Sequence, residues 1–254
     1  MFLKYIKRSS IAYKIRNSLK IKPAAIIIPT DNKSYSISDA FCWRKDKGFI
    51  TNFRYTDLVN YFMKRKNVSI KLVLKNHNNN TLDIIKLNQD NICDNICINN
   101  QVKKFKNLSG HFFIFHELKP KKNETLIIRN SCFTSYSFQG KTPSVVHGNL
   151  PVLAEDNLSK TYPNNIIQHS KFRNYTYQIQ NNFSSFDKVE AFILNPTDIN
   201  LKIEINDILF YLQPYTSKIL QLPKASIYRI KSKCLHLRPI LFVYKDNNFD
   251  VMHA

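Results

Sequence analysis

The chain has few of the residues that form tight turns and phosphate-binding loops. Only four of its 254 residues are glycine. This excludes a collagen-like or linker-like chain and leaves no glycine-rich phosphate loop. Asparagine is abundant where turns are expected, and it suits them because it tolerates left-handed backbone geometry and hydrogen-bonds its own backbone. No cofactor is predicted.

Cysteines are few and long apolar runs are absent. The five cysteines are odd in number and follow no disulfide or zinc spacing. No secretory signal is recognisable, because lysine and arginine interrupt the apolar positions near the N-terminus. We therefore expect reduced thiols and a cytoplasmic location. No stretch reaches the ~20 apolar residues that a membrane-spanning helix needs, so no transmembrane segment is predicted.

Acidic residues are scarce beside basic ones. The chain has 18 Asp and Glu against 38 Lys and Arg, which gives a formal net charge of +20. Lysine, asparagine and isoleucine are all over-used, a bias typical of an AT-rich genome, so much of this excess reflects composition. The resulting field still favours anionic partners. Residues 1–22 form a basic segment without any acidic residue.

What is present indicates an all-β protein with a substantial core. Hydrophobic residues make up 43% of the chain and aromatic residues 13%, which is enough to bury a core. Many short alternating segments separated by polar turns, with no βαβ rhythm, predict a mainly antiparallel fold. We expect two β-sandwich or jelly-roll-like halves, at residues 23–130 and 131–254, with one short helix and the basic segment 1–22.

Two stretches follow the same pattern and suggest an internal repeat. In residues 68–87, two alternating segments flank an Asn-rich break, and residues 189–205 repeat this arrangement around Asn195-Pro196. Period-two alternation is typical of a strand with one buried face. Each stretch follows an aromatic segment and precedes a short apolar run. We therefore expect a hairpin in each half, at equivalent places.

One helix and one long loop region complete the expected layout. Thr56 is predicted to cap a helix that runs to Lys66, with Leu58, Tyr61 and Phe62 on one face. Residues 139–174 contain few periodic runs and are predicted to be loops. Long loops inside a compact domain are often functional, so this region is a place to look for a site.

The candidate ligand-binding residues lie in and beside the start of that region. They combine cationic, aromatic and amide side chains that can contact a polar ligand, and they are Arg129, Tyr136, Lys141, His147 and Asn149. The tripeptide 147–149 has two interpretations. Glycine after histidine allows close approach to a ligand, but Gly and Asn also suit a plain turn with positive φ.

Histidines offer a weaker alternative site. His111 and His116 are separated by an odd number of positions, so an extended strand places them on opposite faces. No H-x-H, H-x-x-x-H or C-x-x-C pair occurs, so no metal ligands are assigned. A G-x-S-x-G elbow is also absent, so no catalytic residues are assigned.

These patterns favour a non-catalytic binding protein for a carbohydrate-like or polyanionic ligand, with contacts from residues 129–149. One alternative is a cupin-type enzyme with a histidine-centred metal site. Another is a protein that binds nucleic acid or a membrane surface through its basic N-terminus, although no nucleic-acid-binding motif is present. Whether the protein is an enzyme stays open, with binding favoured over catalysis.

Overall fold

The fold is known from a computed structural model that describes most of the chain. The described residues are 12, 15, 18, 19, 34–65, 69–87, 93–105, 108–117, 124–129, 132–156, 164–179, 182–235 and 237–254. The predicted basic segment 1–22 lies outside them except for four residues, and so does the apolar stretch 24–28. Residue 236, a histidine, also lies outside them.

The protein is all-β and mainly antiparallel, as predicted. The described residues contain two short α-helices, where one was expected; they are α3 (Leu58–Met63) and α4 (Ile98–Gln101). Two 3₁₀ turns are η1 (Asp46–Gly48) and η2 (Phe183–Ser185). The strands of the N-terminal part are β1 (Ser34–Arg44), β2 (Phe49–Thr56), β3 (Ser69–Asn76), β4 (Thr81–Leu87), β5 (Cys93–Cys97), β6 (Ser109–Glu117), β7 (Leu126–Arg129), β8 (Phe133–Phe138), β9 (Ser144–His147), β10 (Asn149–Asp156) and β11 (Asn164–Asn165). Those of the C-terminal part are β12 (Tyr175–Ile179), β13 (Lys188–Leu194), β14 (Leu201–Ile205), β15 (Ile208–Leu212), β16 (Ser217–Leu222), β17 (Tyr228–Ser232), β18 (Ile240–Lys245) and β19 (Asn248–His253).

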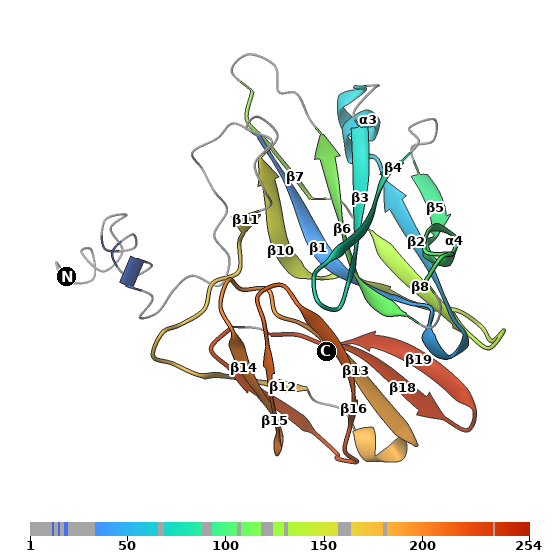
Figure 1. The fold of residues 1–254 in the computed structure, drawn as a ribbon, viewed down its shortest axis with the longest axis vertical. Helices are drawn as coiled ribbons and strands as arrows, with labels where there is room; N and C mark the ends of the chain where they lie inside the picture. The colour runs from blue at the N-terminus through green and yellow to red at the C-terminus, as the bar shows by residue number, and fades with distance from the viewer. Residues whose placement is uncertain are drawn as a thin grey trace.

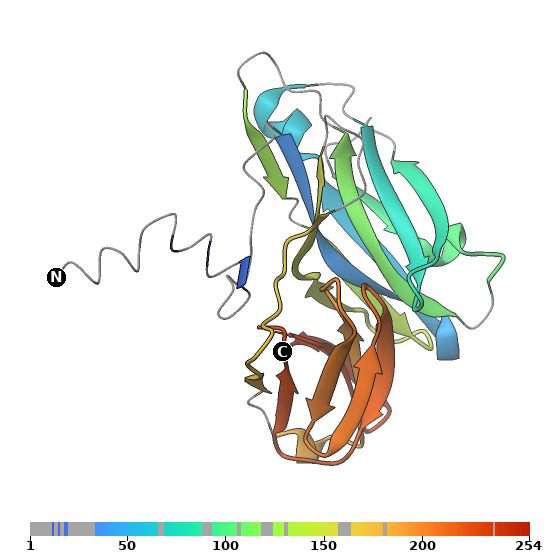
Figure 2. The same cartoon turned by 60° about the vertical axis from the view of Figure 1, so that its left-hand side comes forward.

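The described strands form four sheets in two groups. The first group holds a seven-stranded sheet, ordered β11-β10-β1-β6-β3-β4 with β7 beside β1, and a four-stranded sheet ordered β5-β2-β8-β9. The second group holds the sheets β12-β17-β14-β15 and β16-β13-β18-β19. The two groups lie one above the other in Figure 1, and Figure 2 shows the same division from another side. The strands up to β11 pair within the first group, and the strands from β12 onward pair within the second. The division in strand pairing therefore lies between β11 and β12, whereas the expected halves met at residues 130 and 131.

The seven-stranded sheet is buried on both faces at its centre. On β6, Phe112 and Ile114 pack with the core between the two sheets of the first group. The alternate residues Phe113 and Phe115 belong to a larger cluster that includes most of the second group. This explains the uninterrupted apolar run on β6, because a strand covered on both faces has no polar side. Since that larger cluster crosses the junction, the four sheets do not form two clearly separate jelly rolls.

The two stretches that suggested a repeat have different structures. The first is a hairpin, in which β3 pairs antiparallel with β4. The second is not, and that prediction is wrong: β13 pairs with β16 and β18, whereas β14 pairs with β15 and β17. The buried Asn195 lies where the chain crosses between the two sheets. Its side chain donates to the carbonyls of Ile199 and Leu212 and accepts from the backbone of Thr197.

The predicted helix exists, but its cap and its buried face differ. Asp57, not Thr56, is the N-cap, and its carboxylate accepts from the backbone N–H groups of Val59 and Asn60. Val59 is the buried residue, while Tyr61 and Phe62 are 49% and 72% exposed. The helix is too short to bury a stripe of residues, so one side chain anchors it to β7.

The predicted loop region 139–174 contains strands β9, β10 and β11. The first two are separated by Gly148 alone, which joins the β2 sheet to the β1 sheet. A Cβ atom on Gly148 would lie 2.5 Å from Phe41 Cε1 and 2.7 Å from Asp39 Cβ. Gly148 does not have positive φ, so the turn interpretation of residues 147–149 is wrong. Close approach of the backbone to β1 requires the glycine.

Candidate ligand-binding groove

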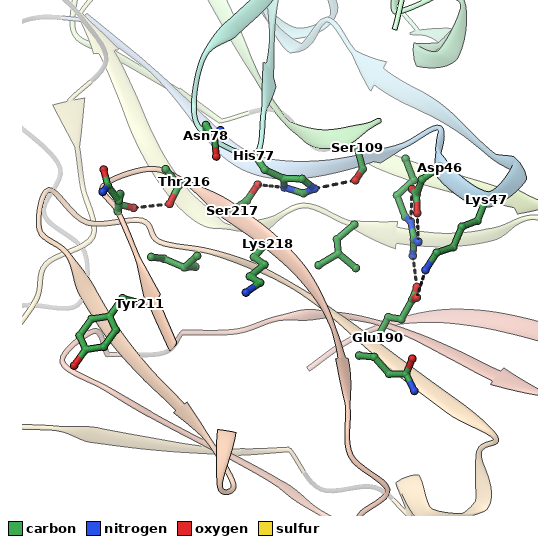
Figure 3. A pocket seen from close by; sticks show the side chains of 15 residues that line it. Asp46, Lys47, His77, Asn78, Ser109, Glu190, Tyr211, Thr216, Ser217 and Lys218 are labelled. Atoms are coloured by element: carbon green, nitrogen blue, oxygen red, sulfur yellow. Dashed lines mark hydrogen bonds and ion pairs between the residues drawn. The ribbon is translucent and has the colours of Figure 1, made fainter. Parts of the chain in front are cut away.

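An open groove of about 830 Å³ lies where the two groups of sheets meet. Its upper wall in Figure 3 comes from η1, the β3–β4 turn and the start of β6. The opposite wall comes from β13, β15, β16 and the connection between β15 and β16. Clefts between packed units are common places for ligand sites. We therefore treat this groove as the candidate site.

Two turns and one edge strand bring the polar groups of the groove together. The β3–β4 turn carries His77 and Asn78, and Asn79 in it adopts positive φ, as an asparagine readily does. The η1 turn carries Lys47, also with positive φ, and ends at Gly48. Strand β16 contributes Ser217 at its start.

His77 forms hydrogen bonds with serines from both groups of sheets. Its Nδ1 lies 2.7 Å from Ser217 Oγ, and its Nε2 lies 2.8 Å from Ser109 Oγ. Figure 3 shows the ring held between these two hydroxyls. The fully buried His111 also contacts Ser217 Oγ, through its Nδ1 at 3.0 Å. Because the Ser217 hydroxyl has one proton, at least one of the two rings must donate to it.

The chemistry of this group suits hydrogen bonding better than proton abstraction. Burial lowers the pKa of His77 to about 4, so the ring is neutral near pH 7. A general base works best when its pKa is close to the working pH. Both ring nitrogens are hydrogen-bonded to hydroxyls, which do not stabilise an imidazolium as a carboxylate does. His77 is therefore a neutral bridge between the two walls of the groove.

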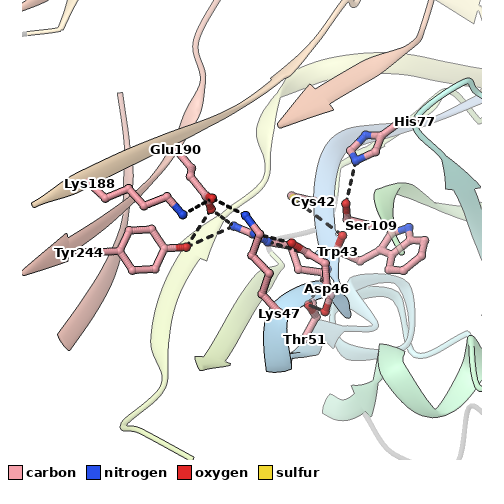
Figure 4. Close-up of polar contacts among 11 residues, drawn as sticks. Cys42, Trp43, Asp46, Lys47, Thr51, His77, Ser109, Lys188, Glu190 and Tyr244 are labelled. Atoms are coloured by element: carbon pink, nitrogen blue, oxygen red, sulfur yellow. Dashed lines mark hydrogen bonds and ion pairs between the residues drawn. The ribbon is translucent and has the colours of Figure 1, made fainter. Parts of the chain in front are cut away.

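A buried ion-pair network contributes residues to the lining of the groove, and Figure 4 shows its contacts. Arg44, whose side chain is 0% exposed, donates to Glu190 Oε2 at 2.7 Å and also pairs with Asp46 at 2.6 Å. Glu190 additionally pairs with Lys47 at 2.9 Å and Lys188 at 2.6 Å. The guanidinium lies 4.0 Å from the centroid of Phe49, one of the rings that cover it. The network thus joins β1 to β13 across the junction.

The network holds its charges in place. Burial alone would raise the pKa of Glu190, but Arg44, Lys188 and Lys47 outweigh this effect and lower it well below its ordinary value. Burial would likewise lower the pKa of Arg44, while Asp46 and Glu190 raise it above its ordinary value. Both groups are charged at neutral pH. Because every charged group of the network contacts a group of opposite charge, the network itself is a structural joint.

Unpaired positive charge in the groove comes from β16. Lys218 is exposed, and the structure gives it no carboxylate partner within the described residues. Its amine lies 5.7 Å from the centroid of the Phe210 ring. Tyr211, which is 64% exposed, lies on the same wall, and Gln213 and Gln221 are exposed beside it. The groove therefore offers one free cation, an aromatic face and several amides.

None of the five residues predicted as ligand contacts lines this groove. Three of them lie around Asp39 on β1. Arg129 donates two hydrogen bonds to the Asp39 carboxylate, at 3.0 and 2.9 Å, and His147 ends β9 one residue before Gly148, which lies against Asp39. Asn149 pairs with Ala40 in the β1–β10 ladder and is buried, and its Oδ1 accepts no hydrogen bond from the described residues.

The other two predicted residues lie elsewhere. Tyr136 is 0% exposed, and its hydroxyl donates to the carbonyl of Cys42 at 2.9 Å, so it is part of the core. Lys141 follows the turn after β8 and donates its backbone N–H to Phe138. The five residues therefore do not share one cavity, although three are neighbours of Asp39.

Apart from His77 and His111, which both contact Ser217, the described histidines are scattered. His116 lies 3.8 Å from Asp57, His169 lies 3.4 Å from Asp198, and the ring of His147 packs on Phe133. Within the described ranges, no three His, Cys, Asp or Glu side chains are close enough together to hold a metal ion. All five cysteines are free thiols, with Cys93 exposed. No helix of the described part is long and apolar enough to cross a membrane.

Sequence reasoning missed the residues that define the groove. His77, Ser109 and Ser217 are far apart in the chain, and neither serine stands in a recognisable motif. The signal that was available is one histidine within the Asn-rich β3–β4 turn. Its partner Ser217 lies 140 positions away in the sequence, and no local pattern predicts a contact over such a separation.

Comparison with known proteins adds little. No protein-family model matches the chain, and no curated protein matches it. Among solved structures, an anti-sigma factor domain-containing protein matches with a TM-score of 0.20 and 9% sequence identity, over 85% of this chain and 82% of that one. A TM-score this low does not indicate a shared fold.

Proposed function

We propose that this is a non-catalytic binding protein that takes a polyanionic or carbohydrate-like ligand into the groove. The observation that carries the proposal is the composition of the groove walls. They combine the exposed Lys218 with the exposed ring of Tyr211 and with hydroxyl and amide side chains. Such groups hydrogen-bond and stack on a polar ligand without reacting with it.

The net charge of the chain supports the anionic part of this proposal. An excess of 20 positive charges raises the concentration of anions near the surface. Within the groove, Lys218 is the cation with no carboxylate partner among the described residues, so an anionic ligand would meet it first. The proposal keeps the ligand class predicted from the sequence and replaces the contacts from residues 129–149 with groove residues.

The two-part architecture supports the same site. In each group of sheets, buried side chains from both sheets share a core, which we take as two sandwich-like halves. Polar side chains on loops and strand ends at the junction of such halves are held by rigid scaffolds on both sides. A rigid scaffold lowers the entropic cost of ordering a ligand site.

Dextran sulfate and unsulfated dextran test the proposal as a polyanionic probe and a neutral carbohydrate probe. We expect saturable binding of dextran sulfate that weakens as salt is raised from 50 to 300 mM, because screening reduces the attraction. Lys218→Glu should weaken it about tenfold or more, a loss of about 1.4 kcal/mol. Lys86→Glu is the matched control, since Lys86 is also exposed but lies on β4, outside the groove. Equal loss in both variants, or no binding of either polymer, would contradict the proposal.

Tyr211→Ala tests the carbohydrate-like part separately. We expect it to weaken binding of unsulfated dextran, because the exposed ring offers a face on which a sugar can pack. Leu209→Ala is the control: Leu209 is 51% exposed on the same strand, but it does not line the groove. Dextran binding that both substitutions leave unchanged would restrict the ligand to polyanions.

A further inference from the structure

Strand β16 has a free edge in the groove. It is the outermost strand of the sheet β16-β13-β18-β19, and β13 is its one partner among the described strands. The six β13–β16 pairs run from Val189↔Leu222 to Leu194↔Ser217 with no register shift. Edges that must not pair are often blunted by bulges or prolines. The β16 edge has neither, although Lys218 gives it one charge.

The direction of the backbone groups on this edge follows from one hydrogen bond. The N–H of Ser217 donates to the carbonyl of His77 at 2.9 Å, so it points away from β13. In an antiparallel ladder, residues alternate between facing the partner strand and facing away from it. The backbone groups of Ile219 and Gln221 therefore also face away from β13. Both residues line the groove, so these groups face the groove.

A neighbouring bond agrees with this alternation. The N–H of Asn195 donates to the carbonyl of Thr216 at 2.9 Å, one residue before Ser217. Thr216 thus faces the β13 side, and Ser217 faces the other side. At one end of the edge, His77 already supplies the bond that an added strand would supply. Beyond it, Ile219 and Gln221 present two N–H donors and two carbonyl acceptors.

We propose that the ligand of the groove is an extended, acidic segment of a partner protein, which adds to the edge of β16 as a further strand. This rests on the proposed function and names its polyanion as a polypeptide. Main-chain bonds to Ile219 and Gln221 supply the pairing, as in other cases of strand addition. Acidic character follows from charge complementarity, because the exposed Lys218 directly precedes Ile219 on β16 and the chain carries a net charge of +20.

The side chains around the edge suit a peptide that alternates between two kinds of residue. Successive residues of a strand point to opposite faces, so one set of peptide side chains meets the wall that carries Lys218. The amine of Lys218 and the exposed ring of Tyr211 are available to that set. The other set faces the wall that carries His77 and Asn78. Glutamate at alternate positions would therefore place every carboxylate on the Lys218 side.

Amide hydrogen exchange of the free protein tests the geometry of the edge, residue by residue. We expect the amides of Ile219 and Gln221 to exchange at least tenfold faster than those of Lys218 and Leu220, which bond to β13. The amide of Ser217 should be slow because His77 accepts its proton. Equal protection of all four residues from 218 to 221 would overturn the proposal, since the edge would then be occupied.

A decapeptide of alternating threonine and glutamate tests the partner. We expect saturable binding, with slowed exchange of the Ile219 and Gln221 amides in the complex. Ile219→Pro should weaken binding at least tenfold, because proline removes a donor that faces the groove and leaves the β13 bonds intact. Leu209→Pro is the matched control. In the β14–β15 hairpin, Leu209 belongs to a pair whose backbone groups face outward, outside the groove.

The outcomes separate this inference from the proposed function. Dextran sulfate binding that is weakened by Lys218→Glu, together with no binding of the threonine–glutamate peptide, overturns strand addition alone. If Ile219→Pro leaves binding of the threonine–glutamate peptide unchanged, strand addition is likewise overturned. A decapeptide of alternating threonine and lysine should not bind, and equal binding of it would overturn the acidic character. If Ile219→Pro does not fold, protection of the Ile219 and Gln221 amides by the peptide decides the question in the unmodified protein.

Discussion

The two stretches with the same sequence pattern, 68–87 and 189–205, show what alternation does and does not determine. Both contain two strands, as period two predicts. In the first, the Asn-rich break is a surface turn, and β3 pairs with β4. In the second, the break is a buried crossover, and the two strands join different sheets. Alternation thus sets which face of a strand is buried, whereas the partner strand depends on contacts distant in sequence.

The difference also separates two uses of a polar break. The first turn presents His77 to the groove, where it bonds to Ser217 of β16. The second break hides Asn195, which satisfies three backbone carbonyls where the chain leaves one sheet for another. A surface turn is free to carry a functional side chain. A buried crossover has to satisfy its own polar groups first.

The largest expected effect on stability concerns the ion pairs made by the first strand of each stretch. These involve Glu190 on β13 and Lys71 on β3. Glu190 is 2% exposed and accepts from Arg44, whose side chain is 0% exposed. Glu190→Ala leaves the buried guanidinium without that partner, and should lower the free energy of unfolding by about 3–5 kcal/mol. Urea denaturation measures it.

The matched control for that prediction is Glu155→Ala, which removes one of the two carboxylate partners of Lys71, the other being Glu117. The Lys71–Glu155 pair is more open, with side-chain exposures of 21% and 11%. Burial raises the pKa of Glu155, while the bond from Lys71 opposes this rise. We expect a loss of about 1 kcal/mol or less, as for other pairs near the surface. Equal losses of stability at Glu190 and Glu155 would show that the junction depends on its ion pair no more than the seven-stranded sheet depends on the Lys71–Glu155 pair.

The next effect compares the two asparagines at the breaks. Asn195→Ala should cost about 2–4 kcal/mol, because it leaves buried carbonyls and the Thr197 N–H without their partner. Asn76→Ala in the first turn removes one exposed bond, from the Asn80 N–H at 2.9 Å, and should cost about 0.5–1 kcal/mol. Both values come from urea denaturation. A similar cost at the two positions would mean that the crossover is not held by its asparagine.

Much of the secondary structure could be predicted from the sequence, and much of the topology could not. The period-two segments at β3, β12 and β14 are strands, because burying one face imposes that pattern locally. The strands β9 and β10 were missed, because Gly148 and the polar residues near it are stabilised by pairing with β8 and β1. The repeat failed for the same reason, since the partners of β13 lie on β16 and β18.

The candidate site was harder to predict than the fold. Tyr136 and His147 are two positions of one polar, aromatic region, yet one side chain is in the core and the other is exposed. A list of residue types that can bind ligands does not say which of them face solvent. The groove depends on contacts between residues about 140 positions apart, such as His77 with Ser217. Pairings of that range follow from the packing of the two groups of sheets.

The smallest effect is a pH dependence of stability at the His77 turn, whereas the Asn195 side chain at the crossover bonds only to backbone groups and the Thr197 hydroxyl. The pKa of His77 is lowered to about 4 in the folded protein by burial, whereas an unfolded histidine titrates near 6.5. Between these values the unfolded chain binds a proton that the folded protein does not. Stability is therefore fully present above pH 6.5 and falls as the pH is lowered toward 4.

His77→Gln tests this dependence, because glutamine hydrogen-bonds to serines but does not titrate. We expect the melting temperature of the unmodified protein to fall between pH 7 and pH 5, and to fall less in His77→Gln. His116, with a pKa also lowered to about 4, and His111 and His253, whose pKa values are likewise lowered by burial, contribute to the remaining fall. Glu190 does not contribute in this range, because its lowered pKa affects stability only below its ordinary value of 4.5. His147→Gln, at an exposed position on β9, is the control. An unchanged pH dependence in His77→Gln would mean that the ring is not held neutral between its two serines, and the groove would then lack the bridge that joins its walls.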